Sequence, residues 1–145
     1  MEAYVIIGGP NTRKSSVTRS LTGCFNRNKR NILLQNGNKI QIYARVSSLQ
    51  ESETTAQDFI AEVNQTQCQH VVFCLWPTSN PSNPTAYPNA SAYLSAFNAL
   101  DWNITKVAVL GNTPAIYQNQ APFPNSQTDP INQTAQAVRV HFAWQ

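Results

Sequence analysis

Residues Gly8 to Ser16 have the types and the spacing of a phosphate-binding loop. Two glycines and a proline follow an apolar run, and a lysine and two serines begin the helical pattern that comes next. Backbone N–H groups in such a loop point inward, and the helix adds unpaired N–H groups and a positive partial charge. We therefore predict that this segment binds phosphate, through Gly8, Gly9, Pro10, Asn11, Thr12, Arg13, Lys14, Ser15 and Ser16.

This segment resembles the Walker A motif of P-loop NTPases, in which a strand leads through G-x-x-x-x-G-K-[ST] into a helix. Gly8, Lys14 and Ser15 are in register with the motif, whereas Arg13 replaces its second glycine. The resemblance implies that Lys14 contacts the terminal phosphates of ATP or GTP and that the Ser15 hydroxyl ligates Mg²⁺. If position 13 requires a conformation that glycine adopts most easily, Arg13 strains or reshapes the loop. A plain turn followed by a chance Lys-Ser pair is the alternative.

The order of elements also resembles that of the small GTPase branch of this class. Residues 46–51 fall where that branch has a D-T-A-G-Q-E-like stretch, and Gln50 and Glu51 match it while its aspartate and its glycine are replaced. Asn112 matches the asparagine of the guanine-reading N-K-x-D motif, without its aspartate. The resemblance implies that Gln50 and Glu51 are catalytic candidates that orient water or hold the metal ion, and that Asn112 contacts the nucleotide. A capping and solvating role for Glu51 is the alternative.

The elements that must position these residues alternate between strands and helices. Apolar runs predict buried strands at 3–7, 70–76 and 105–110, and the Asn-Gly pair at 36–37 predicts a hairpin joining 31–35 to 39–46. Helical spacing predicts helices over 14–22, 54–65, 89–100 and from Pro130 onward, the last capped by Asp129. This order predicts one three-layer α/β/α, P-loop NTPase-like domain over residues 1–145. Its five-stranded sheet should be mostly parallel, with one antiparallel hairpin strand.

Two Pro-rich segments, Pro77–Pro88 and Asn112–Thr128, are predicted to be loops that wall the pocket. Ligands of open parallel sheets bind beyond the carboxyl ends of the strands, and both segments follow a predicted strand. Aromatic residues of these loops are candidates either to stack on a nucleobase or to pin the loops to the domain: Trp76, Tyr87, Tyr117 and Phe123.

Charge is distributed unevenly along the 145 residues, whose net charge is +3. Most of the Lys and Arg residues fall before position 46, where Glu2 is the only acidic residue. This indicates an anionic partner, with a solvated basic surface as the alternative for Arg27, Lys29 and Arg30. The three cysteines are interpreted as buried thiols of a cytoplasmic protein. The sequence shows neither a signal peptide nor an apolar run long enough to span a membrane, so no membrane partner is expected.

Three functions are consistent with these observations. The first is an ATP- or GTP-binding P-loop protein, with Mg²⁺ as a possible cofactor and with slow or partner-dependent hydrolysis. The second is a catalytically inactive scaffold in which a phosphate ligand orders the Pro-rich loops for a protein partner; the scarcity of acidic residues and the missing guanine-reading aspartate favour it. The third is a nucleic-acid-associated protein that uses the basic half, whose binding should weaken steeply with salt.

Overall fold

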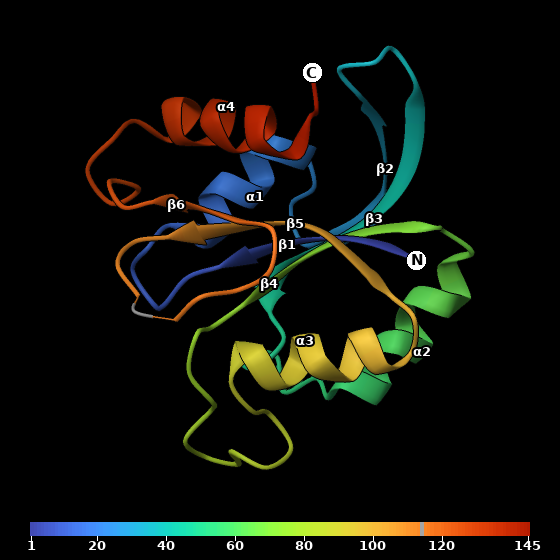
Figure 1. Ribbon diagram of the computed structural model, residues 1–145, viewed down its shortest axis with the longest axis vertical. Helices are drawn as coiled ribbons and strands as arrows, with labels where there is room; N and C mark the ends of the chain where they lie inside the picture. The colour runs from blue at the N-terminus through green and yellow to red at the C-terminus, as the bar shows by residue number, and fades with distance from the viewer. Residues whose placement is uncertain (114) are drawn as a thin grey trace.

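The computed structural model of the chain describes residues 1–113 and 115–145 (Figure 1). Pro114, part of the second predicted loop, lies outside the described residues. The described part forms an α/β fold with one six-stranded sheet and helices on both of its faces. Along the chain the elements are β1 (Glu2–Ile7), α1 (Lys14–Thr22), β2 (Arg27–Leu33), β3 (Lys39–Ser48), α2 (Ala56–Thr66), β4 (His70–Leu75), α3 (Ala90–Ala99), β5 (Asn103–Leu110), β6 (Gln120–Phe123) and α4 (Ile131–Phe142).

The strands are ordered β2-β3-β4-β1-β5-β6, and among the described residues the β2–β3 pair is antiparallel whereas every other pair of neighbouring strands is parallel. The prediction of a mostly parallel sheet with one antiparallel hairpin strand is confirmed, whereas the number of five strands is wrong. The sixth strand, β6, falls inside the segment predicted to be a loop. It is short and contains Pro122, a residue that an edge strand tolerates because one side of its backbone needs no partner.

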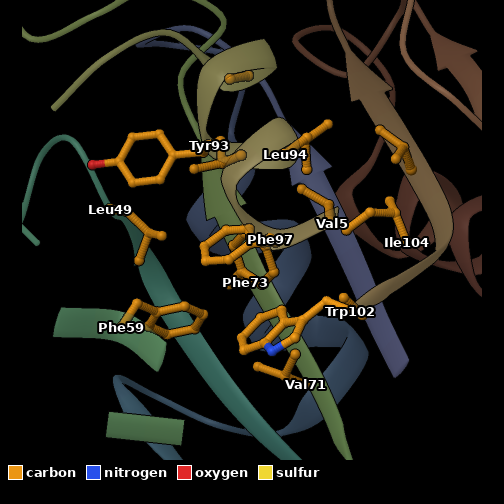
Figure 2. Packing of buried hydrophobic residues seen from close by; sticks show 14 of the residues in the cluster. Val5, Leu49, Phe59, Val71, Phe73, Tyr93, Leu94, Phe97, Trp102 and Ile104 are labelled. Carbon is orange, nitrogen blue, oxygen red and sulfur yellow. The ribbon is translucent and has the colours of Figure 1, made fainter. Parts of the chain in front are cut away.

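Each face of the sheet is covered by two helices. Figure 1 shows α1 and α4 on one face and α2 and α3 on the other. Buried residues of α2 and α3 form one core cluster with β1, β3, β4 and β5, and buried residues of α1 and α4 form the second with the opposite face of the same strands. Figure 2 shows Phe73, Phe97 and Trp102 at the centre of the first cluster, where the rings of Phe97 and Trp102 stack with centroids 4.6 Å apart.

The hairpin is longer than its sequence pattern predicts. Strand β2 begins at Arg27, four residues before the expected strand, and is mostly exposed. Its first residues are polar, so they lack the alternation that marks a half-buried strand. The register also shifts between Ala44 and Ser48 of β3, where an irregularity separates two stretches of pairing with β4. Between these pairs β3 advances by four residues, from Ala44 to Ser48, while β4 advances by two, from Val72 to Cys74.

Two further predictions from the sequence concern the cysteines and the membrane. Cys24, Cys68 and Cys74 are free and buried, as the interpretation of them as small core residues predicts. Among residues 1–113 and 115–145, no helix has the length and apolarity needed to cross a membrane.

Candidate phosphate-binding site

The loop between β1 and α1 is held in shape by Thr12. Its hydroxyl donates a hydrogen bond to the Gly9 carbonyl (2.7 Å), and its side chain is buried between Gly8 and Gly111. A Cβ added to Gly8 would lie 2.3 Å from Thr12 Oγ1, and one added to Gly111 would lie 2.9 Å from Thr12 Cγ2. Both glycines are therefore required because a threonine packs against their α-carbons.

Arg13 adopts the left-handed conformation, with φ 65° and ψ 28°. This is a conformation that glycine adopts without the steric cost that a side chain incurs. The Arg13 guanidinium donates a hydrogen bond to the Asp129 carbonyl (2.9 Å), and the Gln127 amide donates one to the Asn11 carbonyl (2.8 Å). These bonds tie the loop to the segment before α4 and offset the conformational cost of the arginine.

The amino end of α1 is not capped. Arg13 occupies the N-cap position without a side-chain hydrogen bond, and the first turn contains no acidic residue. Within the described part of the chain, no acceptor lies within hydrogen-bond distance of the backbone N–H groups of Lys14, Ser15 and Ser16. Unpaired N–H groups and the helix dipole together favour an anion at this position.

Lys14 is buried, with 7 % of its surface exposed, and its ammonium group forms no ion pair within the described residues. No carboxylate of residues 1–113 or 115–145 lies within 4.0 Å of it. Burial lowers the pKa of Lys14, while Cys74 and Glu51 act weakly in the opposite direction. A buried cation without a partner is costly, so an anion that reaches this group gains a strong interaction.

A cavity of about 320 Å³ lies at the amino end of α1. Lys14 and Ser15 line it from the helix, Glu51 from beyond β3, and Trp76 from the end of β4. The other lining residues belong to the loop and the first turn: Gly9, Pro10, Asn11, Arg13 and Ser16. The predicted phosphate-binding residues thus surround one cavity, except that Gly8 and Thr12 lie beneath it as packing partners.

A second cavity, of about 480 Å³, lies across Gly9 and Pro10, which line both. Thr78 of the first Pro-rich segment and Asn112 and Gln127 of the second contribute neutral hydrogen-bonding side chains to it. The remaining lining residues are Thr12, Pro77, Leu110, Gly111 and Thr113. Both Pro-rich segments therefore meet beside the loop, and this compartment suits an uncharged polar group.

The two catalytic candidates lie in different surroundings. Glu51 is exposed and lines the first cavity. Gln50 is fully buried: its amide donates to the carbonyls of Trp76 (2.9 Å) and Pro88 (3.0 Å) and accepts from the Trp76 N–H (2.9 Å). The Gln50 amide therefore has no N–H left to orient a water, and it joins the end of β3 to both ends of the first Pro-rich loop.

The aromatic residues that are candidates for stacking on a base lie in different surroundings. Trp76 lines the first cavity, whereas Tyr87, Tyr117 and Phe123 line neither of the two cavities. Tyr117 is buried in the core, and Phe123 lies 6.2 Å from His141 of α4 between ring centroids. Pinning of the loop to the domain accounts for these two residues.

Ser15 and Glu51 are the oxygen donors best placed to hold a metal ion together with a phosphate, since both line the first cavity. The described residues contain no group of three or more His, Cys, Asp and Glu that could hold a metal ion by itself. A Mg²⁺ ion at this position would need oxygen ligands from the phosphates and from water, as is usual for this ion.

Sequence reasoning missed the parts played by Thr12 and Gln127. The sequence places Thr12 in the loop without indicating its packing role, and it indicates for Gln127 only a position in a long loop. No local sequence pattern marks either role. Thr12 packs against the distant Gly111 and depends on the shape of the loop, and Gln127 bonds to the distant Asn11.

Comparisons of this chain with protein-family models, curated proteins and solved structures found no match.

Replacing Gly8 with alanine should destabilise the fold, because the new Cβ collides with the Thr12 hydroxyl. We expect the free energy of unfolding to fall by about 1–3 kcal/mol, the usual cost of overpacking. Gly9→Ala is the matched control, since nothing lies within 4 Å of its added Cβ, and it should change stability by less than about 0.5 kcal/mol. Urea denaturation measures both, and equal effects would contradict the packing role of Thr12.

Replacing Lys14 with methionine should stabilise the ligand-free protein by about 1 kcal/mol at neutral pH, because an unpaired buried charge is removed. The advantage should shrink as the pH rises toward 10.5, the ordinary lysine pKa. Since burial lowers the pKa of Lys14 in the folded state, the unfolded chain binds more protons in this interval and wild-type stability rises relative to the variant. Denaturation of both proteins from pH 7 to about pH 10 measures the difference, and a less stable variant at neutral pH would contradict the argument.

Proposed function

We propose that this chain binds a nucleoside triphosphate, with its phosphates in the cavity at the amino end of α1. The observation that carries the proposal is the largely buried side chain of Lys14, which lines that cavity and has no carboxylate of the described residues within 4.0 Å of its ammonium group. The proposal treats the domain as a three-layer, P-loop NTPase-like one, with ATP or GTP as the ligand.

The polyphosphate would satisfy groups that are otherwise unpaired. Lys14 supplies a positive charge, and the backbone N–H groups at the start of α1 supply donors without competition from an acidic cap. Charge-assisted hydrogen bonds of this kind are about twice as strong as neutral ones. Ser15 and Glu51 would complete the coordination of a Mg²⁺ ion bound to the phosphates.

The second cavity would receive the nucleoside. It adjoins the first at Gly9 and Pro10 and is lined by neutral polar side chains that include Asn112. A charged phosphate has no cation to pair with there, whereas a base or a ribose has hydrogen-bonding groups that fit these side chains. Trp76 lines the phosphate cavity instead, so stacking of a base on this side chain would require the base to lie over the helix end.

Hydrolysis would be slow, with Glu51 as the residue that orients water or holds the metal ion. Glu51 is exposed and lines the cavity, but both N–H groups of the Gln50 amide are used by backbone carbonyls. This burial of Gln50 favours the second candidate function, in which the bound ligand orders the Pro-rich loops for a protein partner without being hydrolysed.

Titration calorimetry of ATP and GTP into the wild type and Lys14→Met tests the proposal. We expect micromolar binding to the wild type, about 8 kcal/mol of free energy, and binding weaker by about tenfold to a hundredfold in the variant, because a charged hydrogen bond is lost. Lys106→Gln, which removes a cation that lines neither cavity, should bind like the wild type. If neither nucleotide binds the wild type, the proposal fails.

Metal dependence separates the two candidate functions within the same experiment. Binding that strengthens with Mg²⁺ and loses this gain in Glu51→Gln supports a metal-assisted, hydrolysing site. Affinities that are equal with and without Mg²⁺, and no release of phosphate, support the non-hydrolysing scaffold.

Replacing Asn112 with alanine tests the nucleoside compartment. We expect the affinity for the preferred nucleotide to fall about threefold to tenfold, the effect of one lost hydrogen bond. The affinity for inorganic tripolyphosphate should not change, because this ion occupies the phosphate cavity alone. An equal loss for both ligands would place Asn112 at the phosphates instead.

A further inference from the structure

Strand β2 forms one edge of the sheet and offers half of its backbone groups to an outside partner. Two backbone hydrogen bonds, each 2.8 Å long, lie just beyond the two ends of its pairing with β3. The Val46 N–H donates to the Asn26 carbonyl at one end, and the Leu34 N–H donates to the Asn38 carbonyl at the other. Because inward and outward pointing alternates along an antiparallel strand, Arg27, Lys29 and Asn31 direct their N–H and C=O groups away from β3.

The far end of the same edge already binds a segment of the chain. The Gln35 N–H donates to the Ala143 carbonyl (2.9 Å), and the Gln145 N–H donates to the Leu33 carbonyl (2.8 Å), with an antiparallel bridge between Leu34 and Trp144. Figure 1 shows the carboxyl-terminal residues beside the hairpin. The edge therefore accepts an added strand in this orientation, and within the described residues this pairing extends as far as Leu33.

The part of the edge from Arg27 to Asn31 has no strand beside it within the described residues. Arg27, Lys29 and Asn31 are exposed. Of their outward groups, the Lys29 N–H is held by the Asn28 side chain at 2.8 Å. This bond is local and exposed, so a strand partner can replace it at little cost.

This open stretch is positively charged. Lys29 has no carboxylate within 4.0 Å in residues 1–113 and 115–145, and Arg27 reaches only Glu62, at 3.5 Å. Glu62 is bound more closely by the buried Arg45, at 2.8 Å, so it neutralises little of the charge on β2. Arg30 adds a third cation on the opposite face of the strand.

We propose that Arg27–Asn31 binds an extended acidic segment of a partner protein, which adds to the sheet as an antiparallel strand in line with Ala143–Gln145. Backbone groups provide the affinity in this mode of recognition, and alternate side chains provide the specificity. Basic side chains on an edge strand usually prevent pairing, and here they exclude neutral and basic segments while selecting acidic ones. A second copy of the chain is disfavoured, because Arg27 and Lys29 would face like charges across the new pair.

The experiment uses the full chain and a short capped peptide of alternating glutamate and valine. Backbone amide exchange followed by NMR should show that the N–H groups of Arg27 and Asn31 become protected on adding the peptide. The inward N–H groups of Asn28 and Arg30 should already be protected. The same peptide with lysine in place of glutamate should have no effect.

Two variants separate backbone pairing from charge. Asn31→Pro removes an outward N–H without changing the charge or the ladder with β3, and should weaken peptide binding by about fivefold, as the loss of a backbone hydrogen bond does. Lys29→Gln should weaken peptide binding by about threefold at low salt. The control Lys106→Gln removes a charge from β5, three strands away from β3, and should leave peptide binding unchanged.

Several outcomes would overturn the proposal. One is that the amides of Arg27 and Asn31 exchange equally fast with and without the peptide, a measurement that needs no variant. Another is that Asn31→Pro binds as tightly as the wild type while Lys29→Gln does not, because charge alone would then carry the binding. An oligothymidylate that binds more tightly than the peptide, and is insensitive to Asn31→Pro, would assign the surface to nucleic acid instead.

Discussion

The position of Lys14 at the start of a helix, beneath a loop that excludes water from most of its side chain, is the constraint around which this end of the molecule is built. A lysine whose side chain is largely desolvated and makes no ion pair is tolerated only if the surrounding structure is stable enough to hold it. Here the helix that carries it packs against the sheet through Val17 and Leu21, and the loop above it is fixed by Thr12. The free-energy cost of desolvating Lys14 therefore falls beside the cavity, where a bound anion can offset it.

The sheet order decides which residues surround that lysine. Strand β1 lies between β4 and β5, so the loops after these two strands necessarily flank the loop after β1. Strand β3 is one position further from β1, and Glu51, which follows β3, also lines the cavity. Gln50 fixes this arrangement by joining the end of β3 to Trp76. The buried Gln50 amide thus joins two of the three loops that surround the cavity.

The sequence was sufficient to predict the strands and helices wherever their signal is local. Apolar runs such as that of β4 and helical stripes such as that of α3 report burial directly, so these elements were placed within a residue or two. Strand β6 and the first half of β2 were missed, because an edge strand has little apolar content and its pairing is decided by its neighbours. The burial of Gln50 was also beyond the sequence, since its partners lie at positions 76 and 88.

Thr12 packs against two glycines that are about a hundred positions apart in the chain, Gly8 at the end of β1 and Gly111 at the end of β5. The space left by each missing side chain is filled by the same threonine. In any lineage that keeps this fold, a larger residue at either glycine position requires a smaller residue at position 12, and the Gly111 position also demands a tolerance for positive φ. The three sites should therefore have evolved as one unit, and a change at any one of them constrains the permitted residues at the others.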